Sequence, residues 1–291
     1  MKTKIKLSLA LAIAIALNSL ALQAQDQAAA PAKPKTMQEI LDATQPGDWR
    51  PLDPNNTIYL ELATGRVVIE LAPKFAPEHS KNIVALTRER YWDGLSINRS
   101  QDNFVVQWGD ANGDDEKLKR SFRLAKQTLP AEFVRKSDGL AFTRLPDADG
   151  WAPHVGFVEG MPAAQSPVNN QAWLTHCYGM VGAGRGMEPD SSNGSELYVV
   201  IGQSPRQLDR NITVVGRVAQ GMELLSILPR GTGPLGFYEK AEQRVPIKSI
   251  RLMADVPDED RTSIEILRTD SESFTQLVEA RRNRRDDWYK V

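Results

Sequence analysis

Alternation of apolar and polar residues begins near residue 58 and predicts a mainly β protein. Apolar residues alternate with more polar ones across 58–62 and again across 67–71, on either side of a turn at Thr64-Gly65. Alternation with a period of two places one face of each strand in a core, so we expect a hairpin with one buried face. Short apolar runs between Gly, Pro and Asp turns predict further strands at 104–107, 179–183, 197–201, 213–218 and 247–253.

Helical spacing is found in fewer places. Pro77 and Glu78 open a stretch that continues to about Trp92 with apolar residues three and four apart, and a shorter helix is expected at Met37–Ala43. A C-terminal helix is expected from Ser271 to about Trp288. It is interpreted as an amphipathic helix packed on the main domain, with a partner-binding or surface-binding role as the alternative. Many short strands with few helices favour a β-barrel or sandwich.

The N-terminus has the pattern of a secretory signal peptide over residues 1–24. Three lysines lie within Met1–Lys6, and an apolar run follows from Leu7 to Ala16. This run is short and interrupted compared with the roughly 20 residues of a membrane span, so we expect no stable membrane insertion after cleavage. An uncleaved N-terminal anchor is the alternative. Residues 25–50 are expected to form a linker and a short N-terminal segment, because their first part is small, polar and proline-bearing.

Charge and cysteine content narrow the classes of function. The net charge of -1 gives no basis for binding nucleic acid, and Cys177 has no second cysteine with which to pair. The three histidines have no zinc or hydrolase spacing, and His176-Cys177 is interpreted as buried structure. Asp110–Asp115 lacks the bidentate glutamate of a calcium loop, and the glycines at 182, 184 and 186 lack a surrounding βαβ pattern. We therefore expect turns there, with no metal and no cofactor.

Three ordered blocks of the sequence resemble the cyclophilin family. The first extends from Gly65 to Asp110 and contains Asn98-Arg99-Ser and Asn103-Phe104-Val-Val-Gln107-Trp-Gly109; the second contains Gly179–Arg185 and Asp190–Ile201; the third contains Leu208-Asp209 and Val214–Leu225. The resemblance implies a closed antiparallel β-barrel of about eight strands with a helix over each open end, and an active groove on its outer surface. The cyclophilin-like domain is expected at 51–256, with an insertion near 111–178, and a helical extension at 257–291.

The resemblance also implies peptidyl-prolyl cis-trans isomerase activity and indicates which residues carry it. Arg99 matches the catalytic arginine of the family, Gln107 matches a glutamine that binds the substrate backbone, and Phe104 matches the floor of the proline pocket. An arginine suits this reaction because its planar, charged guanidinium donates hydrogen bonds without transferring a proton. The alternatives are an arginine in a surface ion pair, a solvated glutamine and a phenylalanine in ordinary core packing.

Further substrate-binding positions follow from the resemblance, namely Val105, Gly184, Arg185, Glu196, Tyr198, Gln207, Leu208 and Ile212. Some of them depart from the family pattern. Glu196 replaces a glutamine and is expected to add a charge to the groove. Gln207 replaces a tryptophan and Ile212 a histidine, so the pocket rim is expected to lose an aromatic wall and a polar group. These departures predict weak cyclosporin binding and a reduced or narrowed activity.

Two functions follow from these observations. The first is a periplasmic prolyl isomerase, with proline-containing polypeptides as substrates, that assists the folding of exported proteins. The second is a catalytically weak cyclophilin that acts as a periplasmic chaperone or protein-binding module. The retained Arg99, Phe104 and Gln107 favour the first function, and the departures favour the second. Some aromatic residues of the insertion are expected either to pack on the barrel or to extend the groove, namely Phe142, Trp151, Phe157 and Trp173.

Overall fold

The structure is a computed structural model that describes residues 35–282. The chain divides into two compact units, Gln45–Thr275 and a second unit that combines Met1–Thr44 with Gln276–Val291. The predicted signal peptide and the first part of the linker lie outside the described residues. Within residues 35–282, no helix has the length and apolar composition that crossing a membrane requires.

The described part of the second unit contains α2 (Met37–Asp42) and most of α5 (Glu272–Arg282). Thr36 caps α2, because its hydroxyl accepts a hydrogen bond from the Glu39 N–H while the Glu39 carboxylate accepts one from the Thr36 N–H. Both helices were predicted, and α5 is confirmed as far as residue 282.

A nine-stranded antiparallel sheet forms the main body of the larger unit. Its strands lie in the order β14-β4-β5-β12-β11-β13-β3-β2-β15. Their bounds are β2 (Thr57–Leu62), β3 (Gly65–Leu71), β4 (Ser96–Ser100), β5 (Val105–Gly109), β11 (Met180–Ala183), β12 (Leu197–Val200), β13 (Val214–Gln220), β14 (Val245–Pro246) and β15 (Ser249–Leu252). The five single strands predicted from apolar runs correspond to β5, β11, β12, β13 and β15. In the predicted hairpin, the turn lies one residue earlier, at Ala63-Thr64, because Leu62 pairs with Gly65.

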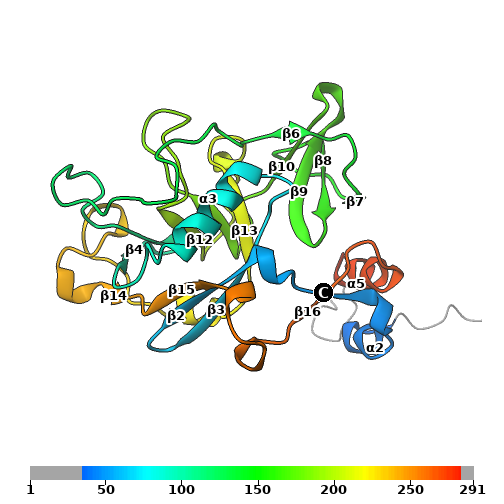
Figure 1. Ribbon diagram of the computed structural model, residues 1–291. Helices are drawn as coiled ribbons and strands as arrows, with labels where there is room; N and C mark the ends of the chain where they lie inside the picture. The colour runs from blue at the N-terminus through cyan, green and yellow to red at the C-terminus, as the bar shows by residue number, and fades with distance from the viewer. Residues whose placement is uncertain (1–34, 283–291) are drawn as a thin grey trace, which may run out of the picture. The chain divides into compact units, whose positions relative to one another are not determined.

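The two edges of this sheet are joined by one segment, residues 245–252. Its first part, β14, pairs with β4. The Ile247 N–H then donates to the Leu95 carbonyl at 2.9 Å, and the Lys248 N–H donates to the Glu61 carbonyl at 2.9 Å. Its last part, β15, pairs with β2. The sheet therefore closes on itself as the predicted barrel of about eight strands, in which β14 and β15 are two parts of one bent strand (Figure 1).

Helices α3 (Pro77–Arg88) and α4 (Met222–Ser226) pack on the barrel core. Proline suits the first position of α3, since that N–H would have no intrahelical partner. Ile83 and Leu86 of α3 and Leu225 of α4 are fully buried in the same apolar cluster as the inward-facing strand residues. Burying such side chains stabilises the fold by about 1.5–3 kcal/mol each.

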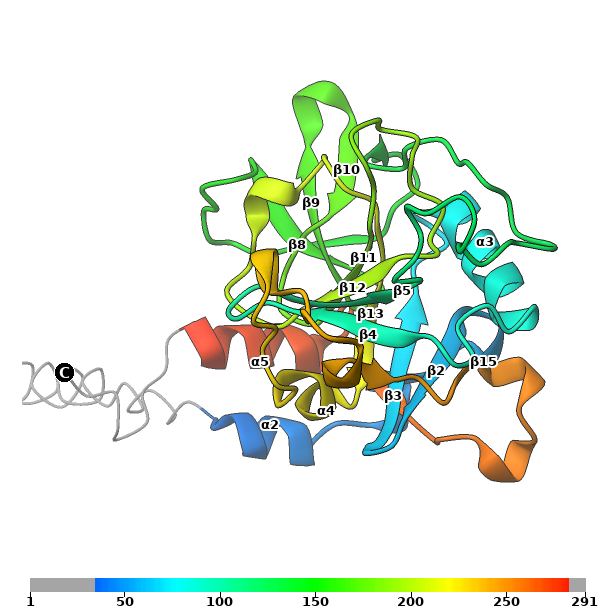
Figure 2. The ribbon, with the colours of Figure 1, turned by 90° about the vertical axis from the view of Figure 1, so that its left-hand side faces the viewer.

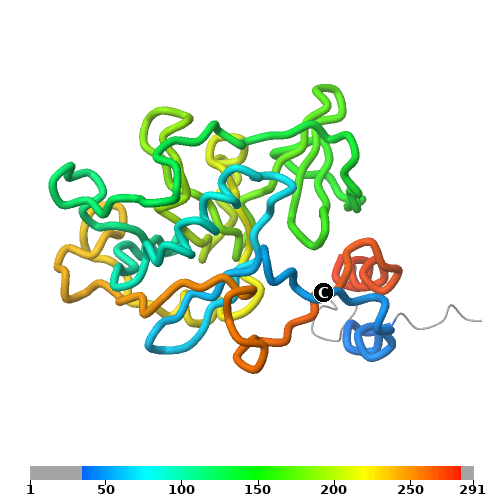
Figure 3. Tube along the Cα trace, viewed as in Figure 1, coloured from blue at the N-terminus to red at the C-terminus, as the bar shows by residue number. Residues whose placement is uncertain are grey.

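The insertion forms a second sheet beside the barrel, as Figures 1 and 2 show. Residues 111–134 contain no helix or strand and connect β5 to this sheet (Figure 3). The strands lie in the order β6-β10-β9-β8-β7. Their bounds are β6 (Arg135–Lys136), β7 (Phe142–Arg144), β8 (His154–Val158), β9 (Met161–Ser166) and β10 (Gln171–Leu174). Sequence reasoning did not find them.

The aromatic residues of the insertion take different positions. Phe142 packs against the cluster that joins the second sheet to the outside of the barrel at Ala72, Met180 and Val214. Trp173 is buried within the second sheet. Phe157 packs edge-on against Phe274, and Trp151 is exposed.

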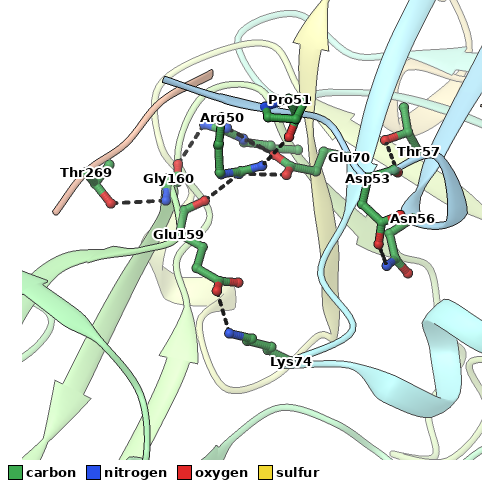
Figure 4. Close-up of polar contacts among 11 residues, drawn as sticks. Arg50, Pro51, Asp53, Asn56, Thr57, Glu70, Lys74, Glu159, Gly160 and Thr269 are labelled. Carbon is green, nitrogen blue, oxygen red and sulfur yellow. Dashed lines mark hydrogen bonds and ion pairs between the residues drawn. The ribbon is translucent and has the colours of Figure 1, made fainter. Parts of the chain in front are cut away.

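Three charged side chains fix the turn of the β8–β9 hairpin (Figure 4). We call this network of Arg50, Glu70 and Arg217 the hairpin clasp. Arg50 donates to the Glu159 carbonyl at 2.7 Å and forms an ion pair with Glu70 at 2.7 Å. Arg217 donates to the Gly160 carbonyl at 2.6 Å and also pairs with Glu70, at 3.1 Å. The carboxylate of Glu70 therefore lies between two guanidinium groups that hold the same turn.

Shorter elements complete the described chain. Strand β1 (Trp49–Pro51) pairs with β16 (Glu265–Leu267). Three-residue 3₁₀ helices lie in the connections, namely η1 (Pro46–Asp48), η2 (Pro54–Asn56), η3 (Pro167–Asn169), η4 (Arg206–Leu208), η5 (Pro234–Gly236), η6 (Ala241–Gln243), η7 (Met253–Asp255) and η8 (Asp258–Asp260).

Candidate active site

Four neighbouring strands bring one residue each into a row on the outside of the barrel. Arg99 of β4 lies opposite Gln107 of β5, Gln107 lies opposite Tyr198 of β12, and Tyr198 lies opposite Gly182 of β11. The pair Arg99 and Gln107 is far in the sequence from the pair Gly182 and Tyr198, and the register of the sheet makes the two pairs neighbours. The residues that precede and follow Gln107, Val106 and Trp108, are fully buried in the barrel core, so the row faces outward.

A β-bulge turns Arg99 into this row. The register shifts between Ile97, which pairs with Trp108, and Arg99, which pairs with Gln107. In a regular strand, residues two apart point to the same face, so Arg99 would follow Ile97 into the core. The extra residue at Asn98 reverses the direction and presents the guanidinium to the outer surface.

The guanidinium of Arg99 is oriented by three hydrogen bonds. Nη1 donates to Gln107 Oε1 at 3.0 Å, Nη2 donates to Gln101 Oε1, and Nε donates to the Leu235 carbonyl at 2.7 Å. All three acceptors are uncharged, and Arg99 forms no ion pair with a described residue. Burial lowers the pKa of Arg99, but an arginine retains its charge far above neutral pH. Three of its five N–H groups are bound to described residues, which leaves two N–H groups without a partner among the residues that the structure describes.

An apolar cluster lies next to the guanidinium. Val105, Tyr198 and Val200 are buried, and Phe104 and Ile212 pack against them. This cluster is separate from the barrel core. The centre of the Arg99 guanidinium lies 5.5 Å from the centroid of the Phe104 ring, within the range of a cation–π contact.

A cavity of about 780 Å³ is lined by every member of this cluster except Val200 and by every member of the row except Gly182. Ten of the eleven predicted site residues line it, namely Arg99, Phe104, Val105, Gln107, Gly184, Arg185, Glu196, Tyr198, Leu208 and Ile212. Gln207 is exposed and is not among the lining residues.

Glu196 lies in the wall of the cavity beside Gln107. The Gln107 amide donates from Nε2 to Glu196 Oε2 at 3.4 Å. Because Arg99 donates to the oxygen of the same amide, the two contacts fix which way the Gln107 side chain faces. Burial raises the pKa of Glu196 to about 8, against the opposing hydrogen bonds from Gln107 and the Asp110 backbone. The Glu196 carboxyl is therefore mostly protonated at neutral pH.

Two glycines make room for the side chains of the site. A Cβ at Gly109 would lie 1.9 Å from Glu196 Oε1, and a Cβ at Gly182 would lie 2.2 Å from the Tyr198 hydroxyl. Both are shorter than any contact that real Cβ atoms make. Only glycine therefore allows these two side chains to lie flat against the neighbouring strand.

Sequence reasoning missed residues that the loop at 229–244 brings to the site. Phe237 forms an isolated β-bridge with Arg99, and its ring centroid lies 5.3 Å from the guanidinium. Leu235 accepts a hydrogen bond from Arg99 through its carbonyl, so its side chain leaves no signal in the sequence. The first part of the insertion also lines the cavity, with residues between Ala111 and Gln127 that include Phe122, whereas Phe142, Trp151, Phe157 and Trp173 do not.

The arrangement is a fixed cationic donor over an apolar pocket, with an amide beside it. It is suited to binding a peptide group next to an apolar ring, because the amide and the free N–H groups provide polar contacts and the cluster takes the ring.

Comparisons with known proteins agree with this description. The family model of cyclophilin type peptidyl-prolyl cis-trans isomerase matches residues 57–252. The chain is 27% identical over 180 residues to a probable peptidyl-prolyl cis-trans isomerase from Brucella suis, which is 62% of this chain and 74% of that protein. It is 26% identical over 216 residues to peptidyl-prolyl cis-trans isomerase-like 1 from Homo sapiens, which is 74% of this chain and 98% of that protein.

A solved structure gives the same result at the level of the fold. The crystal structure of the cyclophilin AquaCyp293 from Hirschia baltica superposes with a TM-score of 0.68 and 25% identity, and the match covers 84% of this chain and 91% of that one. Since the family model spans the whole closed barrel and most of the cavity lining, the chain belongs to the cyclophilin-type peptidyl-prolyl cis-trans isomerase family.

Proposed function

We propose that Arg99 is the catalytic residue of this isomerase and that the cavity around it binds the Xaa-Pro segment of a polypeptide. The observation that carries the proposal is the position of the guanidinium, which is fixed by Gln107 and lies beside the ring of Phe104. The proline ring occupies the apolar cluster, and Gln107 binds the substrate backbone.

The chemistry follows from the amide bond. Rotation about it has a barrier of about 18–20 kcal/mol, because resonance makes the C–N bond partly double. In the twisted transition state this resonance is lost and the prolyl nitrogen regains a lone pair. A donor held near that nitrogen stabilises the transition state more than the planar ground state, and this difference accelerates the reaction. The two free N–H groups of Arg99 are suited to the task, since they donate without losing a proton.

The test is exchange NMR on a short Xaa-Pro peptide with the native protein and an Arg99→Ala variant at equal concentration. We expect native protein to accelerate cis/trans exchange and the variant to lose at least 100-fold in kcat/KM, or about 2.7 kcal/mol. Arg88→Ala is the matched control, because Arg88 pairs with Asp255 on the exposed side of α3 and should retain full activity. If folded Arg99→Ala retains native activity, the assignment of Arg99 is wrong. If the native protein also fails to accelerate exchange, a protein-binding role is favoured instead.

We further propose that the substrates are exported proteins and that the enzyme acts in the periplasm. The support is the leader pattern of residues 1–24, with its three lysines and the apolar run at 7–16. The test is N-terminal sequencing of protein recovered from the periplasmic fraction, with a variant in which Lys2, Lys4 and Lys6 are replaced by Glu as control. Cleavage near residue 24 in the native protein alone supports export. An intact N-terminus in the cytoplasmic fraction contradicts it.

A further inference from the structure

Tyr198 lines the cavity, and its hydroxyl contacts His176, which does not line it. The ring lies over Gly182, and the hydroxyl is 2.8 Å from His176 Nε2, at the C-terminal end of the insertion. The Tyr198 side chain is buried and the His176 side chain is 1% exposed. The two rings are nearly parallel, with centroids 6.2 Å apart. The buried hydroxyl of Tyr198 therefore has His176 Nε2 as its hydrogen-bond partner.

His176 is itself held by charged groups. Its backbone N–H and Nδ1 both lie within hydrogen-bond distance of Asp209 Oδ1, at 2.9 and 3.0 Å. The other carboxylate oxygen of Asp209 accepts from Arg206 Nε at 2.6 Å. Arg206 also forms a bidentate pair with Asp149, at 2.8 and 3.2 Å. The chain of contacts leads from the cavity wall through η4 to the loop that precedes β8.

The proton positions follow from these partners. Burial raises the pKa of Asp209, but the hydrogen bonds from His176 and Arg206 outweigh it and hold the pKa below its ordinary value. The carboxylate is then ionised at neutral pH, so His176 Nδ1 carries the proton that is donated to it. In a neutral imidazole Nε2 is then the acceptor, and the Tyr198 hydroxyl donates to it. The tautomer of His176 thus sets the direction of the Tyr198 hydroxyl.

We propose that His176, oriented by Asp209, is a positioning residue that fixes the Tyr198 ring as part of the proline pocket. The proposal rests on the proposed function of the cavity. It also assigns a role to the insertion, which supplies His176 and, through Asp149, holds the η4 segment that carries Leu208 into the cavity. Without the imidazole acceptor, the hydroxyl has to leave its buried site, and the ring moves with it.

A double-mutant cycle of His176→Phe and Tyr198→Phe tests the proposal, because phenylalanine at 198 has no hydroxyl to satisfy. We measure kcat/KM and KM by exchange NMR with an Xaa-Pro peptide, after circular dichroism has established that all four proteins are folded. The expected loss in kcat/KM is about tenfold for His176→Phe and two- to threefold for Tyr198→Phe. The double variant should lose no more than Tyr198→Phe alone, and the loss in His176→Phe should lie mainly in KM.

Two outcomes would overturn the proposal. If His176→Phe lowers kcat/KM by the same factor whether residue 198 is tyrosine or phenylalanine, His176 stabilises the fold without positioning Tyr198. If His176→Phe leaves kcat/KM unchanged in both proteins, the contact between His176 and Tyr198 has no role in substrate binding. His79→Phe is the matched control, since His79 is another fully buried histidine paired with a carboxylate, Glu132, and it lies outside the cavity. Arg99→Ala in the same assay tests the proposed function separately, because it removes the guanidinium and leaves both His176 and Tyr198 in place.

Discussion

Glu196 makes the stability of this cyclophilin depend on pH in a direction opposite to that of most carboxylates. Burial raises the pKa of Glu196 to about 8, and the charges of Asp110 and Asp114 act in the same sense. In the unfolded chain the same carboxyl ionises near pH 4.5. Between these two values the folded protein binds the proton and the unfolded chain does not, so the free energy of unfolding falls as the pH rises. The loss is complete above about pH 8.

The Glu196→Gln variant isolates this effect, because glutamine has the same shape and does not ionise. The difference between the two pKa values corresponds to about 5 kcal/mol as an upper limit. At pH 9, where Glu196 of the native protein is ionised in both the folded and the unfolded chain, the variant should be the more stable protein by up to this amount. Near pH 4 the variant and the native protein should be equally stable. A glutamine at 196 also accepts the hydrogen bond from Gln107, so activity at pH 7 should stay within threefold.

Urea denaturation at pH 4, 7 and 9 measures the free energy of unfolding of both proteins. Glu116→Gln is the control, because the Glu116 side chain is 83% exposed. A stability difference that does not change between pH 4 and pH 9 would refute the reasoning, since it would mean that Glu196 ionises alike in the folded and unfolded chains.

Three further substitutions test other parts of the fold. Gly182→Ala places a Cβ 2.2 Å from the Tyr198 hydroxyl, so the ring must shift and kcat/KM in the peptide assay should fall about tenfold. Arg217→Ala removes a half-buried cation that pairs with the buried Glu70 in the hairpin clasp and should lower the free energy of unfolding in urea by about 3 kcal/mol. Burial raises the pKa of Glu132, but hydrogen bonds led by that of His79 hold it below its ordinary value. The Glu132→Gln variant should therefore be destabilised at pH 7, and the difference in urea midpoint should shrink as the pH falls below about 4.

Matched controls exist for the first two of these. Gly150→Ala should have little effect, because no atom lies within 4 Å of its Cβ position. Lys74→Ala removes an exposed ion pair with Glu159, worth less than about 1 kcal/mol. Equal losses in a variant and its control would contradict the role assigned to that residue.

The barrel could be predicted because its strands carry a strong local signal. The strands 57–62 and 65–71 alternate clearly, and β12 and β13 are runs of apolar and β-branched residues. The strand that carries Arg99 could not be predicted in this way. Its sequence Ser-Ile-Asn-Arg-Ser has one apolar residue, and a bulge interrupts its period. Arg99 was identified by resemblance to a family, and the alternation of residues alone does not distinguish it from a surface arginine.

The insertion and the loop at 229–244 were beyond prediction for a different physical reason. Strand β9, Met-Pro-Ala-Ala-Gln-Ser, has small side chains and no alternation, so tertiary contacts with β8 and β10 determine its conformation. The loop contributes to the site through the Leu235 carbonyl and through the Phe237 ring. A backbone acceptor carries no residue preference, and a single aromatic in a loop has no period from which its position follows.

The three departures from the family pattern weigh less against catalysis once their surroundings are considered. Glu196 is expected from its sequence to add a charge, but a pKa of about 8 leaves it mostly neutral at pH 7, where it offers the groove an uncharged polar group as a glutamine would. Gln207 provides no aromatic wall, but Phe237 brings an aromatic ring to the cavity, 5.3 Å from the guanidinium of Arg99. Ile212 packs against the buried apolar cluster and adds contact area in place of a polar group. Despite the three departures, the site therefore keeps the Arg99 donor, an aromatic ring beside it and an apolar pocket. These are the features that stabilisation of a twisted prolyl amide requires.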